Sequence, residues 1–266
     1  MAPQFDKIIN ARDLGGLPAA GGRLIRHGLL LRTASLNEAT DADVRMLQEK
    51  YNLKRIFDFR TLEEIQRQPD REVPGAEHIS LPTLDVEAER RSGDAVPEEF
   101  FADVPKYIVH MSFHGVVQRT ASALYPSLVQ SEYSQLQYSV FLNLILQTEE
   151  GAVLWHCSQG KDRTGIGAAF VLAALGADRE TIVADFDHSN IVYRELIEDY
   201  SHRILEHGGG ENELDVVRAF LGAHTGNFCR VLDYIDREWG SLHNYLNTCL
   251  SLTDEDMEVL RERYLE

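Results

Sequence analysis

A cysteine followed six positions later by an arginine is the pattern in this sequence that could carry out chemistry. The stretch WHCSQGKDRTG places Cys157 at the end of a short apolar run and Arg163 beyond a loop that contains Gly160. A loop that joins a strand to a helix can point successive backbone N–H groups into one concavity, with the positive end of the helix dipole behind it. Such a concavity suits a phosphate dianion.

The residues of this loop have complementary tasks toward a phosphate. Gly160 allows a tight turn and a close approach of the backbone to a ligand, and Arg163 can donate two parallel hydrogen bonds to phosphate oxygens. The same groups favour the thiolate of Cys157, so the pattern predicts a nucleophile for phosphoryl transfer. We expect Thr164 to donate its hydroxyl to that thiolate or to the leaving sulfur. The residues expected to bind phosphate are Ser158, Gln159, Gly160, Lys161, Asp162 and Arg163.

Two short apolar runs are expected to be strands that bring Asp58 and Cys157 to one place. LKRIFDF (53–59) and AVLWHC (152–157) are typical of buried strands. Strands alternate with helical patterns along the chain, which predicts an α/β domain with a mainly parallel central sheet flanked by helices. In such a sheet the ligand site lies at the carboxyl ends of the strands, where both residues stand.

Capping and turn signals mark the other elements. Thr40 with Asp43, and Thr253 with Asp256, are capping boxes that begin helices. The remaining expectations, in chain order, are turns or a hairpin at 10–24, a strand at 75–82, an exposed and mobile acidic segment at 85–104, helices through most of 105–148, a buried helix at 163–176 that Gly176 ends, and helices over 180–207 that the GGG at 208–210 stops. We expect a single domain over residues 1–266, with a helical insertion near 85–148.

The charge of the chain limits its partners. The net charge is −17, from 26 Lys and Arg against 43 Asp and Glu, and such a protein repels nucleic acid and anionic lipid. The longest apolar runs, 165–177 and 140–146, are too short to cross a bilayer, so we expect no integral membrane association. Three widely spaced cysteines suit a reducing compartment. With no visible signal peptide, we expect a cytoplasmic protein, or one exported without such a signal.

The stretch HCSQGKDRTG resembles the signature His-Cys-x5-Arg-Ser/Thr-Gly of the cysteine-dependent protein tyrosine phosphatases. Its Gly-Lys-Asp-Arg-Thr form is similar to the microbial tyrosine phosphatases, a family that includes a secreted mycobacterial enzyme and a listerial lipid phosphatase. NARDLGG (10–16), IFDFRTLEE (56–64) and ADFDHSN (184–190) resemble further motifs of that family, with Phe59 where the family has leucine and Phe186 where it has tyrosine. The resemblance covers most of the chain and is weakest over 85–135.

The resemblance implies a phosphotyrosine phosphatase-like fold with a helical lid, and hydrolysis of phosphomonoesters in two steps. Cys157 would attack phosphorus to give a phosphocysteine, a general acid would protonate the leaving oxygen, and water would then release phosphate, while Arg163 and the loop amides hold the phosphate oxygens. It implies no cofactor and no metal. His156 would support the loop. Other motif positions, which either orient the loop or only form structural ion pairs, are Arg12, Asp13, Arg32, Arg60 and Glu63.

The general acid and the substrate stay open at this point. Asp162 inside the loop and Asp58 at the neighbouring strand end are both candidates for the acid, and either could instead brace an arginine. The substrate is a phosphorylated protein, with phosphotyrosine first, or a phosphoinositide, whose second phosphate Lys161 could bind. A silent phosphate-binding module would lack Cys157 or Arg163, and both are present. The sequence specifies no oligomeric state.

His110 and His114, four apart on an expected helix, are a conceivable pair of metal ligands. No third ligand at zinc spacing accompanies them, so we predict ordinary helix packing there and no metal site.

Overall fold

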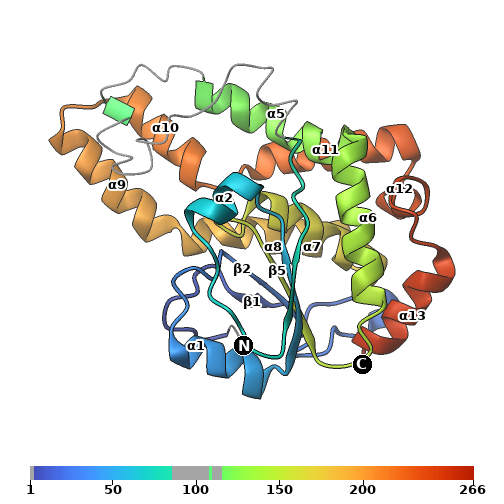
Figure 1. Cartoon of the computed structure of the whole chain (residues 1–266). Helices are drawn as coiled ribbons and strands as arrows, with labels where there is room; N and C mark the ends of the chain where they lie inside the picture. The colour runs from blue at the N-terminus through green and yellow to red at the C-terminus, as the bar shows by residue number, and fades with distance from the viewer. Residues whose placement is uncertain (1–2, 86–107, 110–115) are drawn as a thin grey trace.

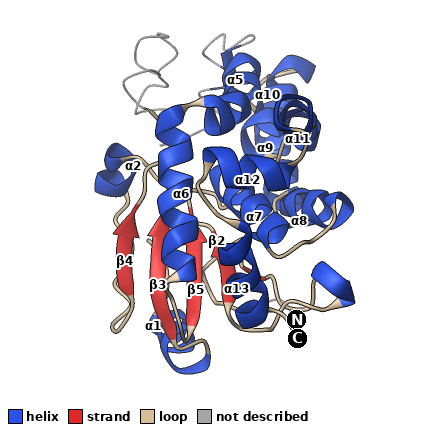
Figure 2. Cartoon of the chain, turned by 90° about the vertical axis from the view of Figure 1, so that its right-hand side faces the viewer, coloured by secondary structure: helices blue, strands red, loops and turns tan. Residues whose placement is uncertain are grey.

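The computed structural model describes residues 3–85, 108–109 and 116–266, and these form a sheet covered by helices (Figures 1 and 2). The strands are β1 (Arg12–Asp13), β2 (Leu30–Thr33), β3 (Leu53–Asp58), β4 (Glu77–Ser80) and β5 (Ala152–His156). The helices of the N-terminal half are α1 (Asp41–Arg45), α2 (Leu62–Arg67), α5 (Val116–Gln130) and α6 (Glu132–Leu146), with the short turns η1 (Ala20–Gly22) and η2 (Met46–Lys50). Those of the C-terminal half are α7 (Asp162–Ala174), α8 (Arg179–Val192), α9 (Arg194–Glu206), α10 (Glu211–Leu221), α11 (Thr225–Trp239), α12 (Leu242–Cys249) and α13 (Asp254–Tyr264).

The strand order of the sheet, β1-β2-β5-β3-β4, brings the two chemically interesting strand ends together. β1 is antiparallel to β2, and the other neighbours run parallel. At the carboxyl edge of the sheet, His156 of β5 pairs with Thr33 of β2 on one side and with Asp58 of β3 on the other. The prediction of an α/β fold with a mainly parallel central sheet is therefore confirmed, and the residue after β5 is Cys157.

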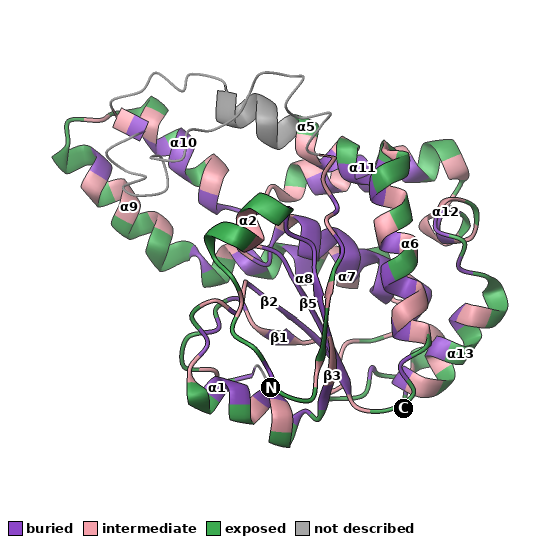
Figure 3. Cartoon of the chain, viewed as in Figure 1, coloured by how far each residue is buried: buried purple, intermediate pink, exposed green. Residues whose placement is uncertain are grey.

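The central strands of the sheet are buried on both faces, which explains their apolar runs. Side chains of β5 alternate between two clusters: Val153 and Trp155 pack with residues of α6 and α7, whereas Leu154 packs on the opposite face with Leu47, which follows α1. A strand that is covered on both faces needs apolar residues at successive positions rather than at every second one. Figure 3 shows this burial on the strands and on α7.

The local signals of the sequence correspond to element boundaries. The capping boxes at Thr40 and Thr253 are both formed, and Gly176, with a φ of +79°, follows the end of α7 as expected of a helix-terminating glycine. The expected helix over 40–51 begins as α1 and continues as the π-helical turn η2. The expected helical run over 180–207 divides at Tyr193 into α8 and α9.

The helices predicted within 105–148 are confirmed where the structure describes them, as α5 and α6. His110 and His114 lie outside the described residues, and so does the segment expected to be mobile (85–104), apart from residue 85. In Figure 1, α9 and α10 extend away from the sheet, and they share a small apolar cluster that includes Ile204 and Val217. The single domain with an insertion near 85–148 stays a prediction. In the described part of the chain, no helix has the length and apolar character needed to span a membrane.

Candidate active site

The loop between β5 and α7, residues 157–161, turns tightly at the carboxyl edge of the sheet. Gly160 has a φ of +66°, a backbone conformation that favours glycine. A Cβ atom at this position would lie 2.2 Å from the carbonyl oxygen of Thr33, at the end of β2. Both the conformation of the loop and its close packing on β2 therefore require glycine at position 160.

Side chains from other segments hold the carbonyl groups of this loop. Asn10 Nδ2 donates to the carbonyl oxygens of Gln159 (2.9 Å) and Gly160 (3.0 Å). Arg32 Nη2 donates to that of Gly160 (2.8 Å), and the hydroxyl of Tyr193 donates to that of Gln159 (2.6 Å). In a trans peptide the N–H points opposite to the carbonyl. The N–H groups of residues 160 and 161 are therefore turned away from these partners, as an anion cradle requires.

The guanidinium groups of Arg12 and Arg32 converge on Asp185 of α8. Arg12 donates to the Asp185 carbonyl oxygen (2.5 Å) and to Ser189 Oγ (2.9 Å), and Arg32 pairs directly with the Asp185 carboxylate. Both arginine side chains are buried, and burial together with the charge of Arg32 lowers the pKa of Arg12 to about 9. Arg32, which also contacts the Gly160 carbonyl, therefore joins the loop to α8, and Arg12 ties β1 to the same helix.

Asp13 does not reach the loop, although its motif suggested a supporting role there. Its carboxylate accepts hydrogen bonds from the backbone N–H groups of Gly15 (2.9 Å) and Gly28 (2.8 Å), and it lies 3.3 Å from Nδ1 of His27. The structure therefore places Asp13 in the turns between β1 and β2, where it fixes their shape.

Arg163 is held by Glu64 of α2 through two parallel contacts. Its Nη1 lies 2.6 Å from Glu64 Oε2 and its Nη2 lies 2.7 Å from Oε1, while the hydroxyl of Ser158 donates to Oε1 (2.5 Å). Burial opposes the charge of Glu64, but Arg163 and Ser158 together lower the pKa of this carboxyl well below its usual range. Burial opposes the charge of Arg163 as well, and Glu64 raises the pKa of that guanidinium.

The acid that contacts Arg163 is Glu64 and not the neighbouring motif residue Glu63, which is exposed. The reason is local. Thr61 caps α2, and Glu64 closes a capping box by accepting from the Thr61 N–H at 2.9 Å. This turns the Glu64 side chain back toward the start of the helix and hence toward Arg163. The spacing of residues 61 and 64 was the sequence signal that could have identified it.

Asp162 begins α7 and lies between a lysine and a tyrosine. Its carboxylate is 2.6 Å from Lys161 Nζ and accepts a hydrogen bond from the hydroxyl of Tyr125 of α5. Burial opposes its ionisation, but the charge of Lys161 and these two hydrogen bonds lower the pKa of Asp162. Lys161 is itself buried, with 5% of its side chain exposed. The ammonium group that we expected to be available for a second phosphate is therefore paired with Asp162.

Asp58 belongs to an internal ion cluster instead of the open side of the loop. It is fully buried, and its carboxylate pairs with Arg60 Nε (3.0 Å) and Nη2 (2.7 Å). Arg60 also pairs with Asp70 at 2.7 Å, a residue that sequence patterns did not single out. Buried His156 lies against the same group, with Nε2 3.1 Å from Asp70 and Nδ1 3.8 Å from Asp58. Burial opposes its protonation, but both carboxylates raise the pKa of His156.

Cys157 at the start of the loop and Thr164 in the first turn of α7 are both buried. The hydroxyl of Thr164 has no hydrogen-bond partner in the described part of the chain, so it remains available to a group on the loop. Tyr138 of α6 donates to the carbonyl oxygen of Arg163 (2.9 Å), and Trp155 donates to that of Thr164 (3.1 Å). Side chains of α6 and β5 thus fix the first turn of α7.

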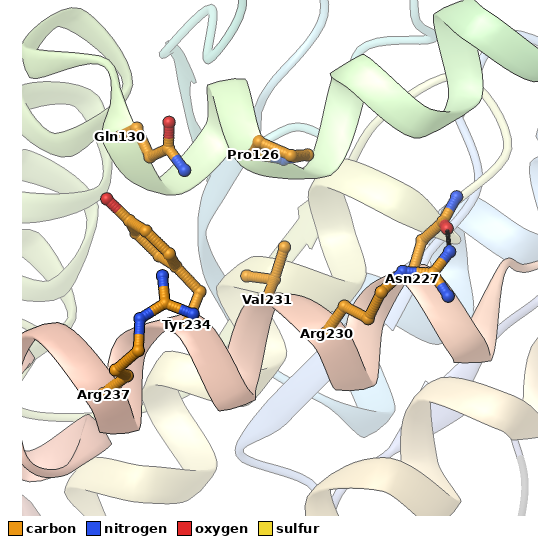
Figure 4. Close-up of a pocket in the computed structure, with 7 residues that line it drawn as sticks. All are labelled: Pro126, Gln130, Asn227, Arg230, Val231, Tyr234 and Arg237. Atoms are coloured by element: carbon orange, nitrogen blue, oxygen red, sulfur yellow. Dashed lines mark hydrogen bonds between the residues drawn. The ribbon is translucent and has the colours of Figure 1, made fainter.

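A cavity of about 260 Å³ lies elsewhere, between α5 and α11 (Figure 4). Its lining residues are Pro126, Gln130, Asn227, Arg230, Val231, Tyr234 and Arg237. None of them belongs to the loop or to its supports. The loop between β5 and α7 therefore remains the place where the sequence and the structure gather reactive groups.

Comparison with known proteins gives consistent matches over the length of the chain. A family model described as "Tyrosine phosphatase family" matches residues 3–266. A protein of Cupriavidus necator named as a tyrosine-protein phosphatase is 30% identical over 264 residues, covering 98% of this chain and 87% of the relative. The triple specificity protein phosphatase PtpB of Mycobacterium tuberculosis is 26% identical over 254 residues, covering 89% and 90%. The crystal structure of P. aeruginosa TpbA is similar at 17% identity and a TM-score of 0.34, covering 75% of this chain and 89% of that one.

Proposed function

The chain belongs to the tyrosine phosphatase family, and on this premise we propose that it hydrolyses phosphotyrosine in proteins through a phosphocysteine formed on Cys157. The observation that carries this proposal is the set of contacts that hold the loop and Arg163. Its carbonyl groups are already held by Asn10, Arg32 and Tyr193, and Arg163 is already oriented by Glu64. A site that is organised before the substrate arrives needs no rearrangement when charge develops on phosphorus.

The phosphate would bind between the loop amides and one edge of Arg163. Glu64 holds the Nη1–Nη2 edge of the guanidinium. The contact between Nη2 and Ser158 Oγ is weaker, at 3.3 Å, and can give way to a ligand. This leaves Nε and Nη2 as the pair of donors for two phosphate oxygens, the geometry in which arginine exceeds lysine.

In the first chemical step, the thiolate of Cys157 forms a bond to phosphorus and the bond from phosphorus to the tyrosine oxygen breaks. Asp162 donates its proton to that oxygen as it leaves. In the second step, water attacks phosphorus and gives a proton to Asp162, while the sulfur–phosphorus bond breaks and restores the thiolate. The hydroxyl of Thr164, which has no partner in the described residues, would stabilise the sulfur as it departs.

Asp162 is a better candidate for the general acid than Asp58. Its side chain is 16% exposed, and the residue begins α7 directly after the loop, whereas Asp58 is fully buried with its carboxylate engaged by Arg60. Burial opposes the ionisation of Asp162, but the charge of Lys161 lowers its pKa. A phosphate dianion beside this carboxyl would raise its pKa again, because two like charges disfavour each other. Substrate binding would therefore favour the protonated form of Asp162, which the first step requires.

Activity on a panel of substrates tests the function, with Cys157→Ser as the nucleophile-free control. We expect metal-independent phosphate release from a phosphotyrosine peptide, abolished in the serine variant. Asp162→Asn should make kcat/KM depend more steeply on the pKa of the leaving group, because a good leaving group needs no acid. Asp58→Asn should leave that dependence unchanged. An unchanged dependence for Asp162→Asn, or a steeper one for Asp58→Asn, would contradict the assignment of the acid.

Phosphoinositides are the second class of substrate to compare in the same assay. The mycobacterial relative is named as a triple specificity protein phosphatase. Lys161 of the present chain suggested activity on phosphoinositides as well. The pairing of Lys161 with Asp162 in a buried position favours the peptide instead. We expect the peptide to exceed every phosphoinositide in kcat/KM. If kcat/KM for a phosphoinositide exceeds that for the peptide by about tenfold, which is about 1.4 kcal/mol in transition-state binding, the phosphoinositide would be the preferred substrate.

A further inference from the structure

Two histidines and two aspartates lie together behind the candidate active site. They are Asp58 at the end of β3, Asp70, His78 of β4 and His156 of β5, and we call them the His–Asp cluster. One ligand atom from each of the four lies within 4.8 Å of those from the other three. The proposed catalytic steps use none of these side chains, so their close grouping requires a separate explanation.

The distances within the cluster match those between the ligands of a zinc ion. Asp70 Oδ2 lies 3.1 Å from His156 Nε2 and 3.2 Å from His78 Nε2. With metal–ligand bonds of 2.0–2.1 Å, the ligands of a tetrahedral zinc site are roughly 3.3 Å apart. Asp58 Oδ2 lies 3.9 Å from His78 Nε2, and the ligand atoms of the cluster all lie within 4.8 Å of one another, so Asp58 would have to move closer to complete the set.

The chemistry and the access of the cluster also suit a metal ion. Imidazole and carboxylate are both common ligands of Zn²⁺, and two of each give a complete tetrahedral set. His78 has 38% of its side chain exposed, whereas at most 4% of each of the other three is exposed. A metal ion could therefore enter from the His78 side at the edge strand β4 and reach the buried ligands behind it.

Arg60 is the obvious competitor for a cation in this place, and the charges do not exclude the metal. Its Nη2 lies 2.7 Å from Asp58 Oδ2 and 2.7 Å from Asp70 Oδ2, the same two oxygens that face His78 Nε2. With both histidines neutral, as metal binding requires, two carboxylates and one guanidinium leave a single net negative charge, which attracts a further cation. Each Oδ2 would accept from Arg60 through one lone pair and bind the metal through another. The backbone N–H of Leu36, 2.7 Å from Asp70 Oδ1, would orient that carboxylate from outside the metal site.

We propose that the His–Asp cluster binds Zn²⁺ and that the bound ion inhibits the enzyme by restraining His156, the residue before Cys157. The second half of this proposal rests on the proposed function, and the first half does not. Nδ1 of His156 lies 3.3 Å from the carbonyl oxygen of Cys157, so a shift of the imidazole toward a metal reaches the nucleophile directly. A displacement of about 1 Å at a reacting centre can cost on the order of 100-fold in rate.

Calorimetric titration of Zn²⁺ into Cys157→Ser tests the site without the thiolate, which is itself a zinc ligand. We expect one equivalent to bind, and the affinity to fall by about tenfold or more when His78→Gln is added. The matched control is His243→Gln. His243 of α12 is another exposed histidine, and its Nε2 lies 2.9 Å from the carboxylate of Asp254. Equal affinity with and without His78→Gln would overturn the proposal. So would an equal loss of affinity with His243→Gln.

Inhibition of the otherwise unmodified enzyme tests the regulatory half. With p-nitrophenyl phosphate as substrate, Zn²⁺ should inhibit reversibly, and a chelator should restore the rate. His78→Gln should keep the zinc-free rate and need about tenfold more Zn²⁺ for half inhibition. The same half-inhibition concentration for both proteins would assign inhibition to Cys157 and refute the regulatory role. A protein that releases no phosphate even without zinc would contradict the proposed function, while the calorimetric result would still decide whether the site exists.

Discussion

Replacing Glu64 by glutamine should weaken catalysis by releasing Arg163 from its fixed orientation. The two contacts between these side chains, at 2.6 and 2.7 Å, are charge-assisted and largely shielded from solvent, with 27% of the Glu64 side chain and 11% of the Arg163 side chain exposed. Glutamine keeps one acceptor and turns an amide N–H₂ toward the other guanidinium nitrogen. One charge-assisted hydrogen bond is worth about 1.5–3 kcal/mol, which corresponds to a loss of roughly 10- to 150-fold in kcat/KM.

Steady-state kinetics with a phosphotyrosine peptide measures this effect, and Glu63→Gln is the matched control. That neighbour carries the same charge on the same helix but is exposed, so its variant should stay within about twofold of the unmodified protein. Unfolding curves of both variants would show that the fold is retained. An unchanged kcat/KM for Glu64→Gln would refute the reasoning that Arg163 needs its carboxylate partner. An equal loss of kcat/KM in both variants would show that the loss comes from the changed charge of α2 and not from the contact with Arg163.

Three further changes test the loop, its acid and its pH response. Gly160→Ala should destabilise the protein by about 1–3 kcal/mol in denaturant titration and abolish activity, because its φ is +66° and a Cβ would collide with the backbone of Thr33. Gly226→Ala, at a helical site with open space around it, should leave both stability and activity unchanged. Tyr125→Phe removes a hydrogen bond that lowers the pKa of Asp162, so the basic limb of the kcat/KM profile should move to higher pH, and a fixed limb would contradict the role of the acid. Because the pKa of Glu64 is lowered in the folded protein, its charge stabilises the fold fully above the unfolded pKa of about 4.3, and this stabilisation is lost as the pH falls. The free energy of unfolding of Glu64→Gln should therefore decline less steeply than that of the unmodified protein between about pH 5 and 2. Parallel curves for the two proteins would refute this.

The parts of the molecule that depend on neighbours along the chain could be predicted from the sequence. The apolar runs before Asp58 and Cys157 predicted two strands that end side by side, and the register of β3 against β5 agrees. The capping pair at Thr40, the turn at Gly176 and the strand–loop–helix context of residues 152–176 are likewise local features. Each is encoded within a few residues, where periodicity and capping chemistry act directly.

The partners of the loop could not be predicted, because they come from distant parts of the chain. Glu64 is 99 residues from Arg163, and Asp185 is 153 residues from Arg32. These pairs meet only because the strand order places β5 between β2 and β3. Sequence patterns therefore marked Lys161 as a charge for the ligand, whereas its partner is the adjacent Asp162. The location of the protein, in the cytoplasm or outside it, stays a prediction.

The cations around the loop are already paired, which changes how a phosphate dianion must be held in this acidic protein. Five basic side chains, Arg12, Arg32, Arg60, Lys161 and Arg163, face five acidic ones, Asp58, Asp70, Glu64, Asp162 and Asp185. Attraction for a dianion must then come largely from backbone N–H groups and the N-terminal end of α7. Protonation of Asp162 is the step that alters this balance, because it leaves the charge of Lys161 without its counterion. A bound dianion thus favours the protonated acid, and the protonated acid strengthens the hold on the dianion. The two events are one linked equilibrium, so Lys161→Met should weaken phosphate binding most at low pH, where Asp162 is protonated, and least at high pH.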